Sequence, residues 1–170
     1  MSDSTTTTAA WTEANITIKH EGMQDSSTTP RAMADLAGNT FPIALRVPDT
    51  AGEAIDFLQW YNAWRSSGGL DSQSPNPTQL LLEAADTFEA AIPWEELKEA
   101  AILFAEDESG MPLSKNGPIR LYVPNGSSKC LNVKSVVKLT FSFSEPSGGV
   151  QEASYGFKNH FSLSDLRRKE

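Results

Sequence analysis

The stretch Gly117–Pro124 has the sequence GPIRLYVP, and it predicts a β-strand. Every second residue is aliphatic, which places Arg120 and Tyr122 together on the opposite face. A second run, residues 133–143, has the sequence VKSVVKLTFSF and predicts a longer strand because its apolar residues also alternate. The segment 125–129 between them begins with Asn-Gly and predicts a loop. A β-sheet is therefore expected to dominate the fold.

Further strands are predicted wherever apolar residues alternate or form short runs between turn residues. They cover Trp11–His20, Phe41–Val47, Gln79–Ala84, Thr87–Ile92 and Ile102–Ala105, with another strand and a short helix after Gln151. Residues 21–31 are turn-like, and residues 71–78 form a loop rich in Pro, Ser and Asn. Because no regular long helices separate the strands, the predicted fold class is α+β, a mostly mixed or antiparallel β-sheet with two or three short helices.

The clearest predicted helix follows a capping-box pair, Thr50 and Glu53, and ends before Gly68. One face of this helix is aromatic and includes Tyr61 and Trp64. Such a stripe favours packing into the core over stacking on the ring of a ligand.

A second, shorter helix is predicted over Trp94–Ala100, directly after Pro93. Glu95 and Glu96 fall in its first turn, where carboxylates interact favourably with the helix dipole. This arrangement is favoured over a pair of catalytic acids.

Length and composition predict one domain. The chain has 170 residues, with 39% hydrophobic and 21% charged residues, which is ordinary for a globular protein. Residues 1–10 are rich in Ser and Thr and are expected to be disordered, whereas residues 11–170 are expected to form a single domain.

The charge of the chain limits the classes of partner that it is expected to bind. The net charge is −8, which argues against binding to nucleic acid or to an anionic membrane surface. No apolar run is long enough to cross a bilayer, and the start of the chain does not resemble a secretory signal. A cytoplasmic protein is expected, with an unidentified protein as a conceivable partner and an oligomeric state that the sequence does not determine.

Motifs of common enzyme classes are absent from the sequence. There is no glycine-rich phosphate loop, no nucleophile elbow and no Cys/His set with metal-ligand spacing. Cys130 is the sole cysteine, and the two histidines, His20 and His160, lie far apart in the sequence. Lys129 would favour a reactive thiolate at Cys130, but a small packed side chain is the favoured interpretation. The sequence assigns no catalytic residue and no metal ligand.

Three stretches in register resemble the molybdopterin-binding domain of sulfite-oxidase-like oxidoreductases. They are Phe88–Leu97, the segment GMPL at 110–113 followed by Gly117–Pro124, and NVKSVVKL at 132–139. The resemblance covers roughly residues 30–143 and implies the fold of that family, with molybdopterin as the cofactor. Carried over residue by residue, it implies that Arg120, Asn132 and Lys134 hold the phosphate and the polar edge of the pterin. Pairing of Arg120 with a carboxylate, and a merely solvated Lys134, remain open alternatives.

The sequence departs from the family at the position that matters most for redox chemistry. The family holds its molybdenum through a cysteine in the first half of the domain, and no cysteine precedes Cys130 here. The tryptophan of the family's V-K-W motif is replaced by Ser135, the position before Asn132 is Leu131 rather than a basic residue, and an arginine-rich segment is missing.

These departures favour a divergent member that binds a pterin without redox turnover, or that binds no cofactor at all. An alternative hypothesis is a protein-interaction or scaffold module that reuses the fold. A third is an oxidoreductase that uses a ligand other than cysteine. Whether the chain is an enzyme stays open, although the missing thiolate argues against catalysis.

Overall fold

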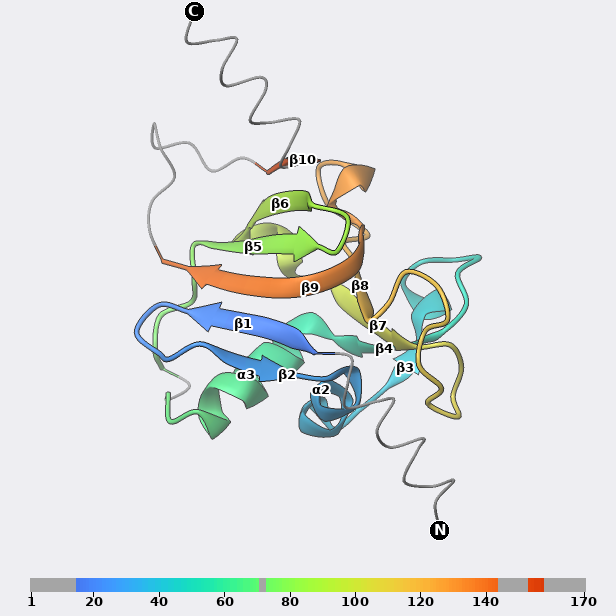
Figure 1. Ribbon diagram of the computed structural model, residues 1–170, viewed down its shortest axis with the longest axis horizontal. Coiled ribbons are helices and arrows are strands. Elements are labelled where there is room, and N and C mark those ends of the chain that lie inside the picture. The colour runs from blue at the N-terminus through green and yellow to red at the C-terminus, as the bar shows by residue number, and fades with distance from the viewer. Residues whose placement is uncertain (1–14, 71–72, 144–152, 158–170) are drawn as a thin grey trace, which may run out of the picture.

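In a computed structural model of the protein, residues 15–70, 73–143 and 153–157 are described. Within these ranges ten strands form one sheet, accompanied by the helices α2 (Pro30–Ala37) and α3 (Phe57–Ser67) (Figure 1). The predicted α+β class and the mostly antiparallel sheet are thereby confirmed.

Strand β9 (Val133–Ser142) lies at the centre of the sheet (Figure 1). One of its edges pairs with β5 (Gln79–Ala84) in antiparallel register. The other edge is shared by β8 (Ile119–Tyr122), which is antiparallel, and β1 (Ile16–His20), which is parallel. β2 (Ser26–Thr28) lies beside β1. The parallel pair β1–β9 makes the sheet mixed, as the sequence predicts.

The remaining strands extend the sheet on both sides of this centre, each antiparallel to its neighbour. Beyond β5 the sheet continues through β6 (Phe88–Pro93) to β10 (Ser154–Phe157). Beyond β8 it continues through β7 (Ala101–Ala105) and β4 (Glu53–Asp56) to β3 (Phe41–Pro42). The strands predicted over 79–84, 87–92, 102–105, 117–124 and 133–143 are confirmed, with small shifts at their ends.

The main core joins the sheet to the two helices. Phe57, Trp60 and Tyr61 of α3 are fully buried, and the ring centroid of Tyr61 lies 4.7 Å from that of Phe141 in β9. The predicted core role of the aromatic helix is confirmed, although Trp64 is only half-buried.

A smaller buried cluster lies on the other face of β4, β7 and β8, since successive residues of a strand point to opposite faces. It comprises Ile43, Ala54, Ala101, Leu103 and Tyr122. With both faces covered, every residue of β7 is buried, which explains why this strand shows no alternation in its sequence.

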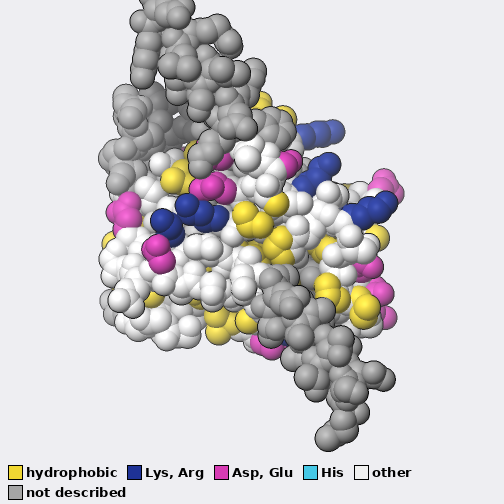
Figure 2. Space-filling model, in the orientation of Figure 1, with side chains coloured by type: hydrophobic (Ala, Val, Ile, Leu, Met, Phe, Trp, Pro, Cys, Tyr) yellow, Lys and Arg dark blue, Asp and Glu magenta, His cyan; other side chains and the backbone are white. Residues whose placement is uncertain are grey.

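The surface carries no dominant patch on the side seen in Figure 2. Basic, acidic and hydrophobic side chains of the described residues are interspersed there. Among the described helices, none combines the length and the apolar character needed to cross a bilayer.

The predicted capping box at Thr50 and Glu53 is wrong. Residues Glu53–Asp56 form β4, and the helix begins at Phe57. Asp56 is its N-cap, because Oδ2 of Asp56 accepts a hydrogen bond from the backbone N–H of Gln59 at 2.9 Å. The buried pairing of β4 with β7 outweighs the local helix signal upstream.

The strand predicted over Phe41–Val47 is also wrong beyond its first two residues. After Pro42 the chain turns into a short 3₁₀ segment, η1 (Ile43–Leu45). Pro42 has no N–H to donate to a ladder, which disfavours a continued central strand. Leu45 is 73% exposed, so the apparent alternation does not correspond to a buried face.

Residues 21–31, predicted as turn-like, contain β2 and the start of α2. Thr29 caps this helix by accepting a hydrogen bond from the N–H of Ala32 at 3.1 Å, and Pro30 occupies its first turn. The helix predicted over Trp94–Ala100 is shorter than expected, a single 3₁₀ turn, η2 (Trp94–Leu97). It ends early because the chain enters the buried strand β7 at Ala101.

Several predictions fall outside the described residues. They include disorder at 1–10, the beginning of the first strand at 11–14, and the short helix near the end of the chain. The strand predicted after Gln151 is confirmed as β10.

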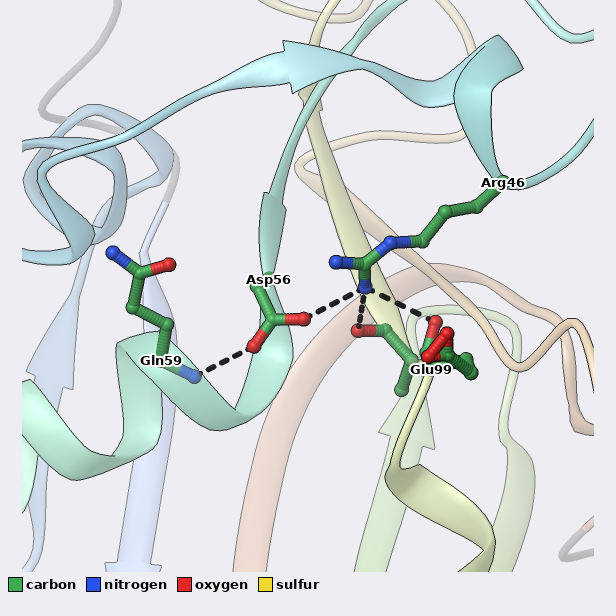
Figure 3. A network of polar contacts seen from close by, with 5 residues as sticks. Arg46, Asp56, Gln59 and Glu99 are labelled. Atoms are coloured by element: carbon green, nitrogen blue, oxygen red, sulfur yellow. Dashed lines mark hydrogen bonds and ion pairs between the residues drawn. The ribbon is translucent and has the colours of Figure 1, made fainter.

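Arg46 ties three separate segments together (Figure 3). Its Nη1 lies 2.7 Å from Oδ1 of Asp56 and also donates to the carbonyl oxygens of Glu99 and Ala100, at 3.2 and 3.0 Å. The side chains of Arg46 and Asp56 are only 26% and 22% exposed, so water screens this ion pair less than an exposed one. Asp56 therefore binds Arg46 with one carboxylate oxygen and caps α3 with the other.

Replacing Asp56 with Ala is expected to remove both interactions and to lower the free energy of unfolding by about 1 to 2 kcal/mol. Asp56→Asn keeps an oxygen for the cap and is expected to lose less. Urea unfolding followed by circular dichroism measures both effects. The matched control is Asp35→Ala, because Asp35 is 73% exposed and pairs only weakly with Arg31. Equal stability of the two alanine variants would contradict this role of Asp56.

Candidate functional site

A surface hollow of about 340 Å³ opens where β9 begins. We name it the Lys134 hollow; its lining includes Asp86, Phe88, Asn116, Cys130, Lys134 and Ser135. These side chains come from the β5–β6 turn and the first residue of β6, the segment before β8, the 3₁₀ turn η3 (Lys129–Leu131) and the start of β9. Three stretches that are distant in sequence, around residues 86–88, 116 and 130–135, thus meet at one end of the sheet.

The backbone around this hollow is unusual. Three of the four non-glycine residues with positive φ in the described ranges lie here: Thr87 (72°), Asn116 (61°) and Ser135 (54°). The N–H of Ser135 donates to the carbonyl of Asn116, and the carbonyl of Ser135 accepts from Ala85, both at 2.9 Å. Left-handed residues are costly for side chains other than glycine, and they concentrate at sites where the fold must aim a particular group. Here they turn Asn116 and Ser135 toward the same space.

Carboxylates fix the loops that carry the lining residues. Oε1 of Glu96 accepts a hydrogen bond from the backbone N–H of Ser127 at 2.8 Å, just before η3. Glu106 accepts from the N–H and the hydroxyl of Ser114, and these hydrogen bonds lower the pKa of Glu106. Glu96 therefore has a specific partner in addition to the helix-dipole role that the sequence predicts. Cys130 lies in η3, capped by Ser128, and is exposed, so the packed side chain favoured from the sequence is wrong.

Asn132 and Lys134, two of the three residues implied by the resemblance, both line the hollow. Oδ1 of Asn132 accepts a hydrogen bond from the N–H of Val123 at 2.7 Å, so this side chain also holds the end of β8 against β9. Its amide nitrogen makes no hydrogen bond with another described residue. Lys134 is exposed and forms no ion pair with any other described residue.

Arg120, the third implied residue, is not part of this lining. Its guanidinium carbon lies 5.2 Å from the ring centre of Tyr122, on the face of β8 opposite Ile119 and Leu121. Its Nε is buried and has no hydrogen-bond partner among the described residues. The structure therefore brings Asn132 and Lys134 together and leaves Arg120 apart.

Reasoning from the sequence missed the other lining residues, among them Asn116, Ser135 and Phe88. The side chains of Asn116 and Ser135 make no hydrogen bond with another described residue, and neither does the ammonium of Lys134. The dipeptide Asn116-Gly117 is a turn signal before a strong strand and was the available clue. Ser135 and Phe88 lie in the stretches that carry the resemblance, but no pattern in the sequence places either of them in a binding site.

The residues present fit only part of the cofactor that the resemblance implies. Asn132 and Lys134 are placed to hold a polar edge and a negative group, but Arg120 faces away from them. Within the described ranges, no group of three or more His, Cys, Asp or Glu side chains is arranged to hold a metal ion.

A buried polar network lies elsewhere, in the core. The ring of His20, 5% exposed, donates from Nδ1 to the carbonyl of Glu21 at 2.8 Å. A carbonyl only accepts, so Nδ1 carries a proton; in the tautomer with its single proton there, Nε2 accepts from the hydroxyl of Tyr61, also at 2.8 Å. Burial raises the pKa of Tyr61, and the guanidinium of Arg65, 5.1 Å from the Tyr61 ring centre, opposes part of this rise. Surrounded by aromatic rings, this network stabilises the core and offers no accessible site.

The chain matches no known protein family, and no curated protein matches it significantly.

The raised pKa of Tyr61 predicts how stability depends on pH. The folded state favours the neutral phenol of Tyr61. The stability that this preference contributes is therefore fully present below pH 10.0, the ordinary tyrosine pKa, and is lost as the pH rises through the higher pKa of Tyr61 in the folded protein. Tyr61→Phe has no phenol to ionise and is expected to lose less stability above pH 10 than the wild type. At neutral pH it is expected to be less stable by about 1 to 2 kcal/mol, because His20 loses its partner.

Urea unfolding across this pH range tests both expectations. Tyr122→Phe is the control, since it leaves Tyr61 in place and is expected to keep the pH dependence of the wild type. The same fall above pH 10 in all three proteins would refute the assignment to Tyr61.

Proposed function

We propose that this protein is a ligand-binding domain without redox turnover, which takes a small anionic, pterin-like heterocycle in the Lys134 hollow. The observation that carries the proposal is the gathering of uncommitted donors around one concave site. Lys134, Asn116 and Ser135 have no partner among the other described side chains, and they border the same space of about 340 Å³. Sites for small molecules combine such a hollow with a few convergent polar groups.

The chemistry of the hydrogen-bond donors in the Lys134 hollow indicates which class of ligand would fit. The ammonium of Lys134 supplies a positive charge for a phosphate or a carboxylate, and a hydrogen bond to a charged group is stronger than a neutral one. The amides of Asn116 and Asn132 are suited to the alternating donors and acceptors at the edge of a pterin. Phe88, which is half-buried, adds an apolar wall.

Molybdopterin is the pterin that the sequence resemblance implies. When bound in a protein of that family, this group supplies a molybdenum centre for oxygen-atom transfer. The present chain has no cysteine before Cys130, and Arg120 lies outside the hollow. We therefore derive no reaction through the cofactor and propose binding alone, with the fold of sulfite-oxidase-like domains as part of the same proposal.

Titration with pterin-6-carboxylate, followed by its fluorescence, tests this proposal on the full chain. Lys134→Ala is expected to weaken binding about tenfold, because it removes one charge-assisted hydrogen bond. Lys129→Ala is the matched control: it makes the same change of charge on the neighbouring turn η3, and Lys129 does not line the hollow.

Saturable binding that only Lys134→Ala weakens would support the proposal. Failure of the wild-type protein to bind the probe, or an equal effect of the two substitutions, would overturn it. The protein-interaction module without a cofactor would then be the better hypothesis.

A further inference from the structure

A second hollow, of about 350 Å³, lies on the sheet across β1, β9, β5, β6 and β10. We name it the Leu81 hollow; its lining includes Lys19, Leu81, Ala91, Thr140, Ser154 and Tyr155. It shares no lining residue with the Lys134 hollow.

The register of the strands explains why there is a hollow here. Lys19 pairs with Thr140, Thr140 with Leu81, Leu81 with Ala91, and Ala91 with Ser154, so these five residues form one row across five strands. Thr140, Ala91 and Ser154 are small, and they leave space on either side of Leu81. The neighbouring residues Leu80 and Leu82 point into the core on the other face.

The floor of this hollow departs from the usual pattern of a sheet with one solvated face. Such a face is ordinarily polar, whereas Leu81 and Ala91 are apolar and only half-buried. The hydroxyl of Thr140 lies beside them in the row and makes no hydrogen bond with another described residue. An apolar floor with an uncommitted hydroxyl suits a ligand that has an apolar body and a polar end.

The charged side chains around the floor determine where the polar end of such a ligand would lie. Lys138, in the next row, is engaged with Glu83 at 3.0 Å. Among the described residues, Lys19 forms an ion pair with Asp25 alone, at 3.6 Å, and their side chains are 45% and 62% exposed, so this pair contributes little. Glu89 lies on β6, three strand spacings from β1, or roughly 14 Å. An anion is therefore favoured at the β1 end, beside Lys19 and Thr140.

We infer that the Leu81 hollow binds a small amphipathic carboxylate. Its apolar body packs on Leu81 and Ala91, and its carboxylate is held by the ammonium of Lys19 and the hydroxyl of Thr140. The site is independent of the Lys134 hollow and of the function proposed for it.

The test uses 4-phenylbutyrate as the probe and the isotopically labelled full chain, with binding followed by amide chemical shifts. We expect saturable shifts at residues of the Leu81 hollow. Lys19→Ala is expected to weaken binding about threefold to fivefold, as for a partly exposed ion pair. Lys98→Ala, the same change at an exposed lysine outside this hollow, is expected to leave binding unchanged.

Two further comparisons test whether binding depends on the carboxylate and on the apolar floor. The neutral 4-phenylbutanol is expected to bind more weakly than the acid, and Ala91→Phe, which fills the floor, is expected to abolish binding while the circular dichroism spectrum stays native. Lys134→Ala is expected to bind 4-phenylbutyrate normally, which separates this test from that of the proposed function. Shifts that do not saturate, equal binding of the alcohol, or full binding by Lys19→Ala or Ala91→Phe would each overturn the inference.

Discussion

The backbone pairing of β9 is the constraint on which the rest of the structure depends. One edge of this strand is occupied by β5, and the other must be divided between β8 and β1. The division falls between Val136, which pairs with β8, and Lys138, which pairs with β1. Just before it lies Ser135, where φ is 54° and the register with both antiparallel neighbours shifts close by. A residue in this conformation bends the strand, and beyond Val136 the partner on this edge changes from β8 to β1. The irregularity that the sheet requires is therefore also what forms one wall of the Lys134 hollow.

The strands around β9 were predictable from the sequence because burial of one face imposes a period of two. The residues from 137 onward show this alternation in their sequence, whereas Gln79–Ala84 is a short apolar run whose burial alternates although its sequence does not. The segment from Phe41 to Asp56 was not predictable, since its conformation is set by distant partners. Arg46 donates hydrogen bonds to the backbone carbonyls just before β7. Asp56 forms an ion pair with Arg46 and also caps α3. No local pattern distinguishes that arrangement from the capping box that Thr50 and Glu53 suggest.

The candidate site was predictable in part, for the same reason. The alternation already placed Arg120 opposite the aliphatic residues of β8, and this is where the structure has it. The bulge near Ser135 could not be predicted from the sequence. This bulge decides that the hollow opens toward Lys134 rather than toward Arg120. Asn116 enters the hollow through a hydrogen bond to Ser135, a contact between segments nineteen residues apart that a local pattern does not encode.

One pair of stacked rings joins the linings of the two proposed sites. Phe88 borders the Lys134 hollow, Tyr155 borders the Leu81 hollow, and their centroids lie 6.5 Å apart with the ring planes inclined by 21°. Such a stack transmits displacement only if one ring moves, and Tyr155 is 41% exposed on β10, which pairs with β6 alone in the described sheet. Motion of Tyr155 can therefore be absorbed by solvent rather than passed to Phe88. For this reason the two hollows are expected to bind their ligands independently.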